Sequence, residues 1–124
     1  MANKILIVDD EPNIVLSLEF LMKQAGYHVR TASDGEAALQ ALAEEPADLI
    51  LLDVMMPRKN GYEVCQSIRE DPALKSIKIV MLTAKGREVE REKGLALGAD
   101  DYVTKPFATL EVVEKVKSML ASAG

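Results

Sequence analysis

Three continuous runs of apolar residues constrain the fold of this chain more than any other feature of its sequence. They are Ile5–Val8, Leu49–Leu52 and Ile79–Leu82. A strand with one solvent-exposed face alternates apolar and polar residues, whereas a strand covered on both faces reads as an unbroken apolar run. We therefore expect three central strands in a sheet that is buried on both sides.

Two further runs mix apolar with polar residues, as strands at the edge of a sheet can. They are His28–Ala32 and Asp101–Thr104. Helical patterns alternate with all five runs, which is typical of parallel βα units. With right-handed crossovers, the natural strand order is 2-1-3-4-5. The sequence thus predicts an α/β fold, (βα)5, with a doubly wound, five-stranded parallel sheet.

The first two helices have recognisable ends. Pro12 suits a first helical turn, and Gly26 suits the end of the same helix. The inward face of this helix is expected to carry Ile14, Val15, Leu18, Leu21 and Met22. The residues from Ser33 to Glu36 resemble a capping box, which predicts a second helix over Ala37–Leu42.

The last two helices differ in how firmly they should be held. The fourth, about Arg87–Leu97, is rich in charged residues and contains Gly94, which costs about 1 kcal/mol relative to alanine. We expect it at the low-stability end of the fold, where switching elements belong. The last helix should begin at Ala108 or Thr109. Its sheet-facing side chains are expected to be Leu110, Val113, Val116 and Leu120.

Composition limits the classes of function. The 124 residues, 48% of them hydrophobic, suffice for one domain with a buried core, so residues 1–124 are expected to form a single domain. The net charge of −5 argues against direct nucleic-acid binding. With Cys65 as the single cysteine, no internal disulfide can form. The absence of a signal-peptide pattern and of any membrane-spanning apolar stretch then favours a cytoplasmic location.

Acidic residues and one lysine follow the predicted strands. Asp9 and Asp10 come after the first run, Asp53 after the third, and Lys105 after the fifth, while Thr83 ends the fourth. Ligands of doubly wound sheets bind beyond the carboxyl ends of the strands at the switch point, which lies here between strands one and three. Carboxylates gathered there would repel one another unless a cation or a proton intervened. Carboxylate oxygens suit Mg²⁺, with Mn²⁺ as a second candidate, and an ion so bound leaves positions for phosphate oxygens. The expected substrate is a phosphoryl group.

Over essentially its whole length, the chain resembles the response-regulator receiver domains (CheY-like) of two-component signal transduction, which have a flavodoxin-like fold. The matching motifs, in order, are Asp9-Asp10, Asp53 before Met56-Pro57, Gly61, Thr83-Ala84, Gly98-Ala99-Asp100-Asp101-Tyr102 and Lys105-Pro106-Phe107. The resemblance implies that Asp53 accepts the phosphoryl group. It also implies that Mg²⁺ is bound directly by Asp10 and Asp53, by the Met55 carbonyl, and by Asp9 through water.

Further roles follow from the same resemblance. Thr83 and Lys105 would grip the phosphoryl oxygens, and the bond before Pro106 would be cis. An aspartate is ordinarily ionised at neutral pH and needs no general base to attack phosphorus. In this family the water that hydrolyses the acyl phosphate passes the residues equivalent to Met55 and Lys85. We expect the apolar Met55 to shield the phosphoryl group.

The resemblance also implies a signalling route. Thr83 would move toward the phosphate and Tyr102 would turn inward, changing the face built from the fourth helix, fifth strand and fifth helix. Implied partners are a histidine kinase or histidine phosphotransfer protein, and a downstream protein or output domain. The same face is a candidate for phosphorylation-dependent homodimerisation, against the alternative of a simple solvated surface. Its charged residues are Lys93, Asp100, Asp101, Glu111, Lys115 and Lys117.

Two other functions use a similar crevice. An aspartate-nucleophile phosphatase typically has a second aspartate two residues after the nucleophile, but Met55 occupies that place after Asp53. A flavin-binding flavodoxin-like protein would need aromatic rings to stack on, and the aromatic content is 4% with no tryptophan. An acidic pocket would also repel a flavin phosphate. Three residues have plain structural interpretations: Asp9 as a helix cap, His28 as a solvated edge-strand residue and Cys65 as a small buried residue.

Overall fold

The fold is known from a computed structural model, which describes residues 3–56, 58–84 and 88–122. Within these described residues, five strands and five helices alternate. They are β1 (Lys4–Val8), α1 (Pro12–Gln24), β2 (His28–Ala32), α2 (Gly35–Glu44), β3 (Leu49–Asp53), α3 (Gly61–Glu70), β4 (Lys78–Ala84), α4 (Glu88–Ala96), β5 (Asp101–Lys105) and α5 (Thr109–Ser122). The predicted runs and the predicted α/β class are confirmed.

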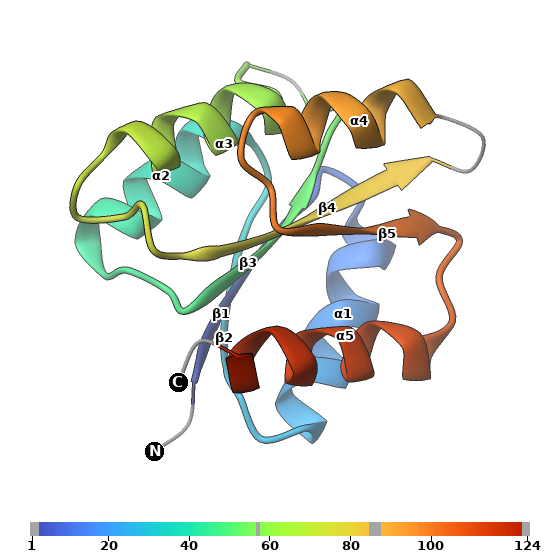
Figure 1. Ribbon diagram of the computed structural model, residues 1–124. Helices are drawn as coiled ribbons and strands as arrows, with labels where there is room; N and C mark the ends of the chain where they lie inside the picture. The colour runs from blue at the N-terminus through green and yellow to red at the C-terminus, as the bar shows by residue number, and fades with distance from the viewer. Residues whose placement is uncertain (1–2, 57, 85–87, 123–124) are drawn as a thin grey trace.

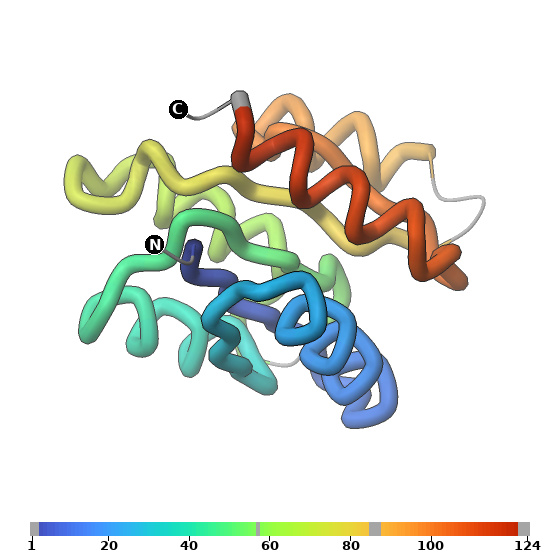
Figure 2. The backbone as a smooth tube through the Cα atoms, turned by 90° about the horizontal axis from the view of Figure 1, so that it is seen from below, coloured from blue at the N-terminus to red at the C-terminus, as the bar shows by residue number. Residues whose placement is uncertain are grey.

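All strands are parallel, and their order in the sheet is β2-β1-β3-β4-β5, as the sequence predicts. Helices α2, α3 and α4 cover one face of the sheet, and α1 and α5 cover the other (Figure 1). Seen from below, α1 and α5 lie together in front of the sheet (Figure 2). The molecule is therefore a three-layer sandwich with helices on both faces of the sheet.

The central strands show why their sequences are unbroken apolar runs. In β1, Ile5 and Ile7 face the α1/α5 side, whereas Leu6 and Val8 face the α2/α3 side. In β3 the residues of Leu49–Leu52 divide between the two faces in the same alternating way, and all are fully buried. Successive side chains of a strand point to opposite faces, so both sets must be apolar.

Two details of the helices differ from the sequence prediction. The prediction of a capping box that begins at Ser33 is wrong. Helix α2 begins at Gly35 and its N-cap is Asp34, whose carboxylate accepts a hydrogen bond from the Ala37 amide at 2.8 Å. Leu110 does not face the sheet but is 75% exposed, and Val112 is buried in its place. The turn that Leu110 belongs to lies beside α1, where Leu110 and Leu21 line a surface hollow.

The predictions for the first helix, His28 and Cys65 are confirmed. Leu18 and Met22 are the buried residues of α1, and Gly26 follows this helix with a positive φ of 97°. His28 is exposed on the edge strand and Cys65 is buried. Arg87, the expected start of the fourth helix, lies outside the described residues. None of the described helices is both long and apolar enough to cross a membrane.

Candidate functional site

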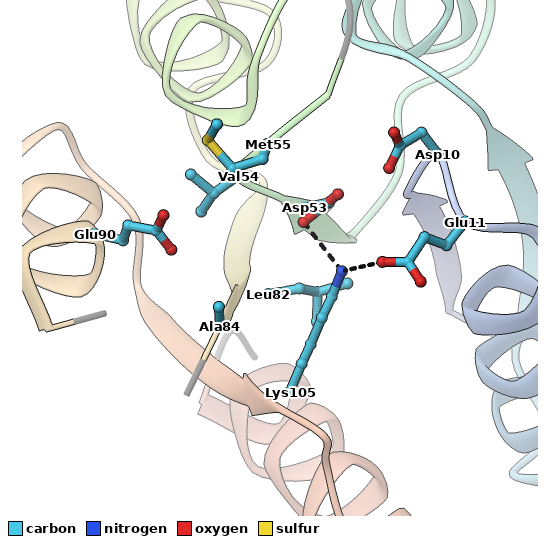
Figure 3. A pocket seen from close by; sticks show the side chains of 9 residues that line it. All are labelled: Asp10, Glu11, Asp53, Val54, Met55, Leu82, Ala84, Glu90 and Lys105. Atoms are coloured by element: carbon cyan, nitrogen blue, oxygen red, sulfur yellow. Dashed lines mark hydrogen bonds and ion pairs between the residues drawn. The ribbon is translucent and has the colours of Figure 1, made fainter. Parts of the chain in front are cut away.

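A hollow of about 290 Å³ lies at the carboxyl edge of the sheet. Its lining residues are Asp10, Glu11, Asp53, Val54, Met55, Leu82, Ala84, Glu90 and Lys105 (Figure 3). They come from the ends of β1, β3, β4 and β5 and from α4. Strand ends thus meet at the switch point between β1 and β3, where a doubly wound sheet places its ligands.

Three carboxylates meet in this hollow. Asp9 and Asp10 follow β1, Asp53 ends β3, and one ligand oxygen from each lies within 4.8 Å of the others. Asp9 and Asp53 are buried and Asp10 is exposed. Such hard oxygen donors fit Mg²⁺ or Mn²⁺, and the exposed Asp10 leaves one side open to water and substrate.

The charge state of Asp53 reflects this crowding. Burial, followed by the nearby charge of Asp9, raises the pKa of Asp53 to about 7, although Lys105 acts in the opposite direction. In the metal-free chain the pKa of Asp53 therefore lies near neutral pH rather than at the ordinary aspartate value of 3.8. A bound cation would favour the ionised form and lower the pKa.

Lys105 connects the carboxylates from the end of β5. Its Nζ lies 3.1 Å from Asp53 Oδ1 and 3.8 Å from Glu11 Oε1 (Figure 3). The same Nζ lies 2.8 Å from Asp9 Oδ2. Burial alone would lower the pKa of Lys105, but its hydrogen bond to Asp9 and the charges of Asp53 and Asp9 raise it. The ammonium is therefore charged over the whole physiological pH range. The Lys105–Pro106 peptide bond is cis, as the resemblance implies.

The two carboxylate oxygens of Asp9 make different contacts. Its Oδ1 accepts a hydrogen bond from the Glu11 amide at 2.9 Å, a local turn contact just before α1 rather than a helix cap. Its Oδ2 forms the short ion pair with Lys105. The interpretation of Asp9 as a cap of the first helix is therefore wrong, because the N-cap of α1 is Glu11. The structure places Asp9 at the predicted site, in contact with Lys105.

Thr83 is completely buried, and its hydroxyl has no hydrogen-bond partner among the described residues. It lies near the end of β4, in register with Thr104 of β5, and does not line the hollow. Buried hydroxyls are nearly always hydrogen-bonded, so an unpartnered one at a strand end points to a missing acceptor. Contact with a ligand in the hollow requires the Thr83 side chain to move.

Met55 lines the hollow and is 65% exposed. The loop that carries it begins with two backbone hydrogen bonds: the Val54 amide donates to the Leu82 carbonyl at 3.4 Å, and the Gly61 amide donates to the Val54 carbonyl at 2.8 Å. Lys85, the other residue expected beside the hydrolytic water, lies outside the described residues. None of the nine lining residues is aromatic, so the hollow offers no ring for a flavin to stack on.

Sequence reasoning missed two acidic residues of the hollow. Glu11 reaches Lys105, and its position directly after Asp10 was the available signal. Glu90 lies on α4, is 6% exposed and lines the hollow. The charge pattern of this helix indicated a solvated surface, and nothing in it marks Glu90 as the buried acid.

The expected output face contains intramolecular contacts. The Tyr102 ring lies under the Arg91 guanidinium at 4.9 Å and the Lys115 ammonium at 5.5 Å. Lys115 also pairs with Asp101 at 3.3 Å. Of the charged residues predicted for this face, the exposed ones are Lys93, Asp100, Glu111 and Lys117. The Lys93 ammonium lies over the Tyr62 ring, 4.5 Å from its centroid.

Asp100 is engaged within the chain in a different way. Its Oδ2 pairs with Arg69 of α3 at 2.7 Å and accepts a hydrogen bond from the Ile79 amide at 2.7 Å. Arg69 in turn donates to the carbonyls of Gly98, Lys75 and Ile77. Asp100 therefore joins the end of α3 to β4 and to the turn before β5.

Known proteins with similar sequences indicate the family of this chain. Residues 5–117 match the response regulator receiver domain family. The alkaline phosphatase synthesis transcriptional regulatory protein PhoP of Bacillus subtilis is 50% identical over 120 residues. That alignment covers 97% of this chain and 49% of PhoP, so the chain spans about half the length of this curated relative.

Solved structures agree in fold as well as in sequence. A crystal structure assigned as a response regulator from Chloroflexus aurantiacus is similar with a TM-score of 0.95 and 40% identity, covering 98% of this chain and 99% of that one. The chemotaxis response regulator CheY4 of Vibrio cholerae is similar with a TM-score of 0.90 and 31% sequence identity, and the match covers 96% of this chain and 99% of CheY4. Neither the phosphatase nor the flavin alternative is favoured by these similarities. The chain belongs to the response regulator receiver domain family, whose members are phosphoacceptor signalling switches.

Proposed function

We propose that Asp53 is the phosphoacceptor of this receiver domain and that Mg²⁺, or Mn²⁺, is held by Asp10, Asp53 and the Met55 carbonyl, with Asp9 acting through water. The observation that carries this proposal is the placement of the buried Asp53 carboxylate. One of its oxygens lies within 4.8 Å of an oxygen of Asp9 and of Asp10, and the carboxylate lies 3.1 Å from the only lysine that lines the described hollow. A bound metal would add a second positive charge to that of Lys105 beside this nucleophile.

The chemistry is an in-line transfer. One Asp53 oxygen forms a bond to phosphorus while the bond between phosphorus and the donor's nitrogen or oxygen breaks, giving an acyl phosphate. When bound, the metal supplies positive charge to the phosphoryl oxygens and lowers the pKa of Asp53. The Lys105 ammonium leaves its carboxylate partners to neutralise a phosphoryl oxygen. The unpartnered Thr83 hydroxyl donates to another.

The chain itself would supply the groups that catalyse its own phosphorylation and dephosphorylation. It would thus act as a switch and not as an enzyme that turns over a separate substrate. Met55 bears on the second reaction, because it lines the hollow and presents an apolar side chain at its exposed side. An apolar side chain neither orients nor deprotonates water. Met55 is therefore proposed to shield the phosphoryl group and to prolong its lifetime.

The proposal extends to partners. The phosphoryl donor is a histidine kinase or a histidine phosphotransfer protein, and residues 1–124 act as a single receiver domain in the cytoplasm. Thr83 and Tyr102 transmit the state of Asp53 to the face formed by α4, β5 and α5. This face then controls a downstream protein or output domain, or pairs with a second copy. The acidic chain itself contacts neither nucleic acid nor membrane.

The test is the intact mass of the protein after incubation with a small acyl-phosphate donor and Mg²⁺. One labile phosphoryl adduct is expected, which disappears with chelator and in the Asp53→Asn variant. The matched control is Asp71→Asn, which changes an aspartate that accepts a hydrogen bond from the Ala73 amide in the turn after α3; this variant should still form the adduct. An absence of adduct under every condition would contradict the proposal and would favour a phosphorylation-independent binding module.

A further inference from the structure

The loop between β3 and α3 contacts the start of α2 at Lys59. A Cβ built on Gly35 would lie 2.1 Å from the Lys59 carbonyl oxygen and 2.5 Å from the Lys59 Cβ. Gly35 is the first residue of α2, so this helix and the loop touch without room for a side chain. Directly after the loop, a Cβ on Gly61 would lie 2.3 Å from the Asp53 carbonyl oxygen, so the two residues that flank the loop lie against each other.

One ion pair reinforces this contact. The Arg58 guanidinium donates from Nη1 to Asp34 Oδ2 at 2.7 Å. The Asp34 side chain is buried, whereas the Arg58 side chain is 66% exposed. Arg58 also has a φ of 67°, the left-handed conformation that side-chain-bearing residues rarely adopt. Arg58 therefore keeps an unfavourable backbone conformation while it makes this pair.

The anchor for the pair is rigid. Asp34 is the N-cap of α2, and its other oxygen accepts from the Ala37 amide. The Ala37 hydrogen bond, and then the Arg58 contact, hold the pKa of Asp34 below its usual value. The carboxylate is consequently ionised at any physiological pH. A helix whose far end packs into the core thus holds the loop through one charged hydrogen bond.

We infer that Asp34 and Arg58 are positioning residues for the metal, because they fix the loop that carries the Met55 carbonyl. This inference rests on the proposed function, which makes that carbonyl a ligand. Neither residue lines the hollow, so neither touches the metal or the phosphoryl group. Groups that orient metal ligands from outside the coordination sphere commonly set metal affinity. No resemblance motif includes either residue, and the geometry alone assigns the role.

The experiment is a calorimetric titration with Mg²⁺ in the absence of any phosphoryl donor. The variants are Arg58→Asn, Asp34→Asn and the double variant. Asparagine tolerates the left-handed conformation at position 58 and still serves as an N-cap at position 34, so both changes remove mainly the ion pair. The control is Lys23→Gln, which removes the exposed Lys23–Glu19 pair of α1 at 3.1 Å. Thermal unfolding of each metal-free variant is measured in parallel.

The dissociation constant for Mg²⁺ should rise roughly tenfold in each single variant, the lower end of what such outer contacts contribute. The double variant should match the single ones, because both changes break the same contact. Lys23→Gln should bind like the wild type. Unchanged Mg²⁺ affinity in folded Arg58→Asn and Asp34→Asn, with a wild type that binds, would overturn the inference and leave the phosphoacceptor proposal standing. A wild-type chain without Mg²⁺ affinity would overturn both.

Discussion

At the scale of single residues, the site contains polar groups whose burial is energetically unfavourable without a ligand. Asp53 is buried beside Asp9, and the Thr83 hydroxyl has no partner among the described residues. Lys105 compensates only in part, since it must serve both Asp9 and Asp53. The protein keeps these features although each costs stability, which is typical of a site that is completed by binding.

The raised pKa of Asp53 predicts a pH dependence of stability in the metal-free chain. The carboxyl titrates near pH 7 when folded and at its ordinary value of 3.8 when unfolded. Between these values the folded state holds the extra proton, so the free energy of unfolding should fall as pH rises from about 4 to about 7 and then level off. The stabilisation that comes from the protonated Asp53 is present at low pH and is lost as the pH rises through the folded-state pKa of about 7.

Asp53→Asn removes this dependence and supplies the measurement. In chelator above pH 8, the variant should be more stable than the wild type by about 2 kcal/mol, roughly half the full linkage value because water screens the pocket. Near pH 4 the two proteins should be alike. Urea unfolding at several pH values checks this, and parallel curves for the two proteins from pH 4 to 8 would contradict it.

At the scale of elements, the sequence predicts the strands better than the helix surfaces. A strand buried on both faces leaves an unmistakable run such as Ile5–Val8, because no polar residue is tolerated there. Caps depend on which oxygen reaches which amide, and Ser33 and Asp34 are both good candidates until the backbone is known. The prediction for Leu110 is wrong for a related reason. Helical spacing predicts which residues share one apolar face of the helix, but it does not predict how much of that face the rest of the molecule covers.

Over its described residues, Glu88–Ala96, helix α4 buries no large apolar side chain of its own. Its buried residues are Glu90 and Gly94, neither of which contributes a large apolar side chain. Gly94 packs against Met81, whose Cγ would lie 3.3 Å from an added Cβ, so a close contact and not only flexibility explains this glycine. The sequence indicated a weakly held helix, but the packing of Gly94 required the structure.

Hydrogen exchange should distinguish α4 from the core. Amides of α4 should exchange through local opening, faster than those of β1, whose residues from Ile5 to Val8 are fully buried. Exchange monitored by mass spectrometry on peptides, or by NMR for single amides, gives the comparison in the unphosphorylated protein. Amides of α4 that exchange as slowly as those of β1 would rule out a loosely held switching helix.

At the scale of the whole molecule, the sequence could predict that Asp9, Asp10, Asp53 and Lys105 meet, because the topology of a parallel sheet brings strand ends together. It could not predict their charge states, which depend on burial, nor the presence of Glu90, which lies on a helix.

The output face is a similar case. Asp100 was expected to be available to a partner, yet its contacts with Arg69 and Ile79 show that it holds this chain together.

Homodimerisation through the α4, β5 and α5 face is a proposal that sedimentation can test. With Mg²⁺ and a phosphoryl analogue such as beryllofluoride, the wild type should sediment as a dimer, and without the analogue as a monomer. Glu111→Lys should weaken the dimer, since Glu111 is exposed on α5. Asp100→Asn is not a suitable probe because of its role within the chain. Equal sedimentation with and without the analogue would remove the dimer proposal.

The most direct test of the phosphoacceptor role is to locate the acyl phosphate chemically. Borohydride reduces an aspartyl phosphate to homoserine and releases phosphate, leaving a stable mark on the acceptor. After treatment with an acyl-phosphate donor and Mg²⁺, peptide sequencing should find homoserine at position 53 only. Homoserine at position 9 or 10, or none in protein that carries a labile phosphoryl group, would contradict the assignment of Asp53.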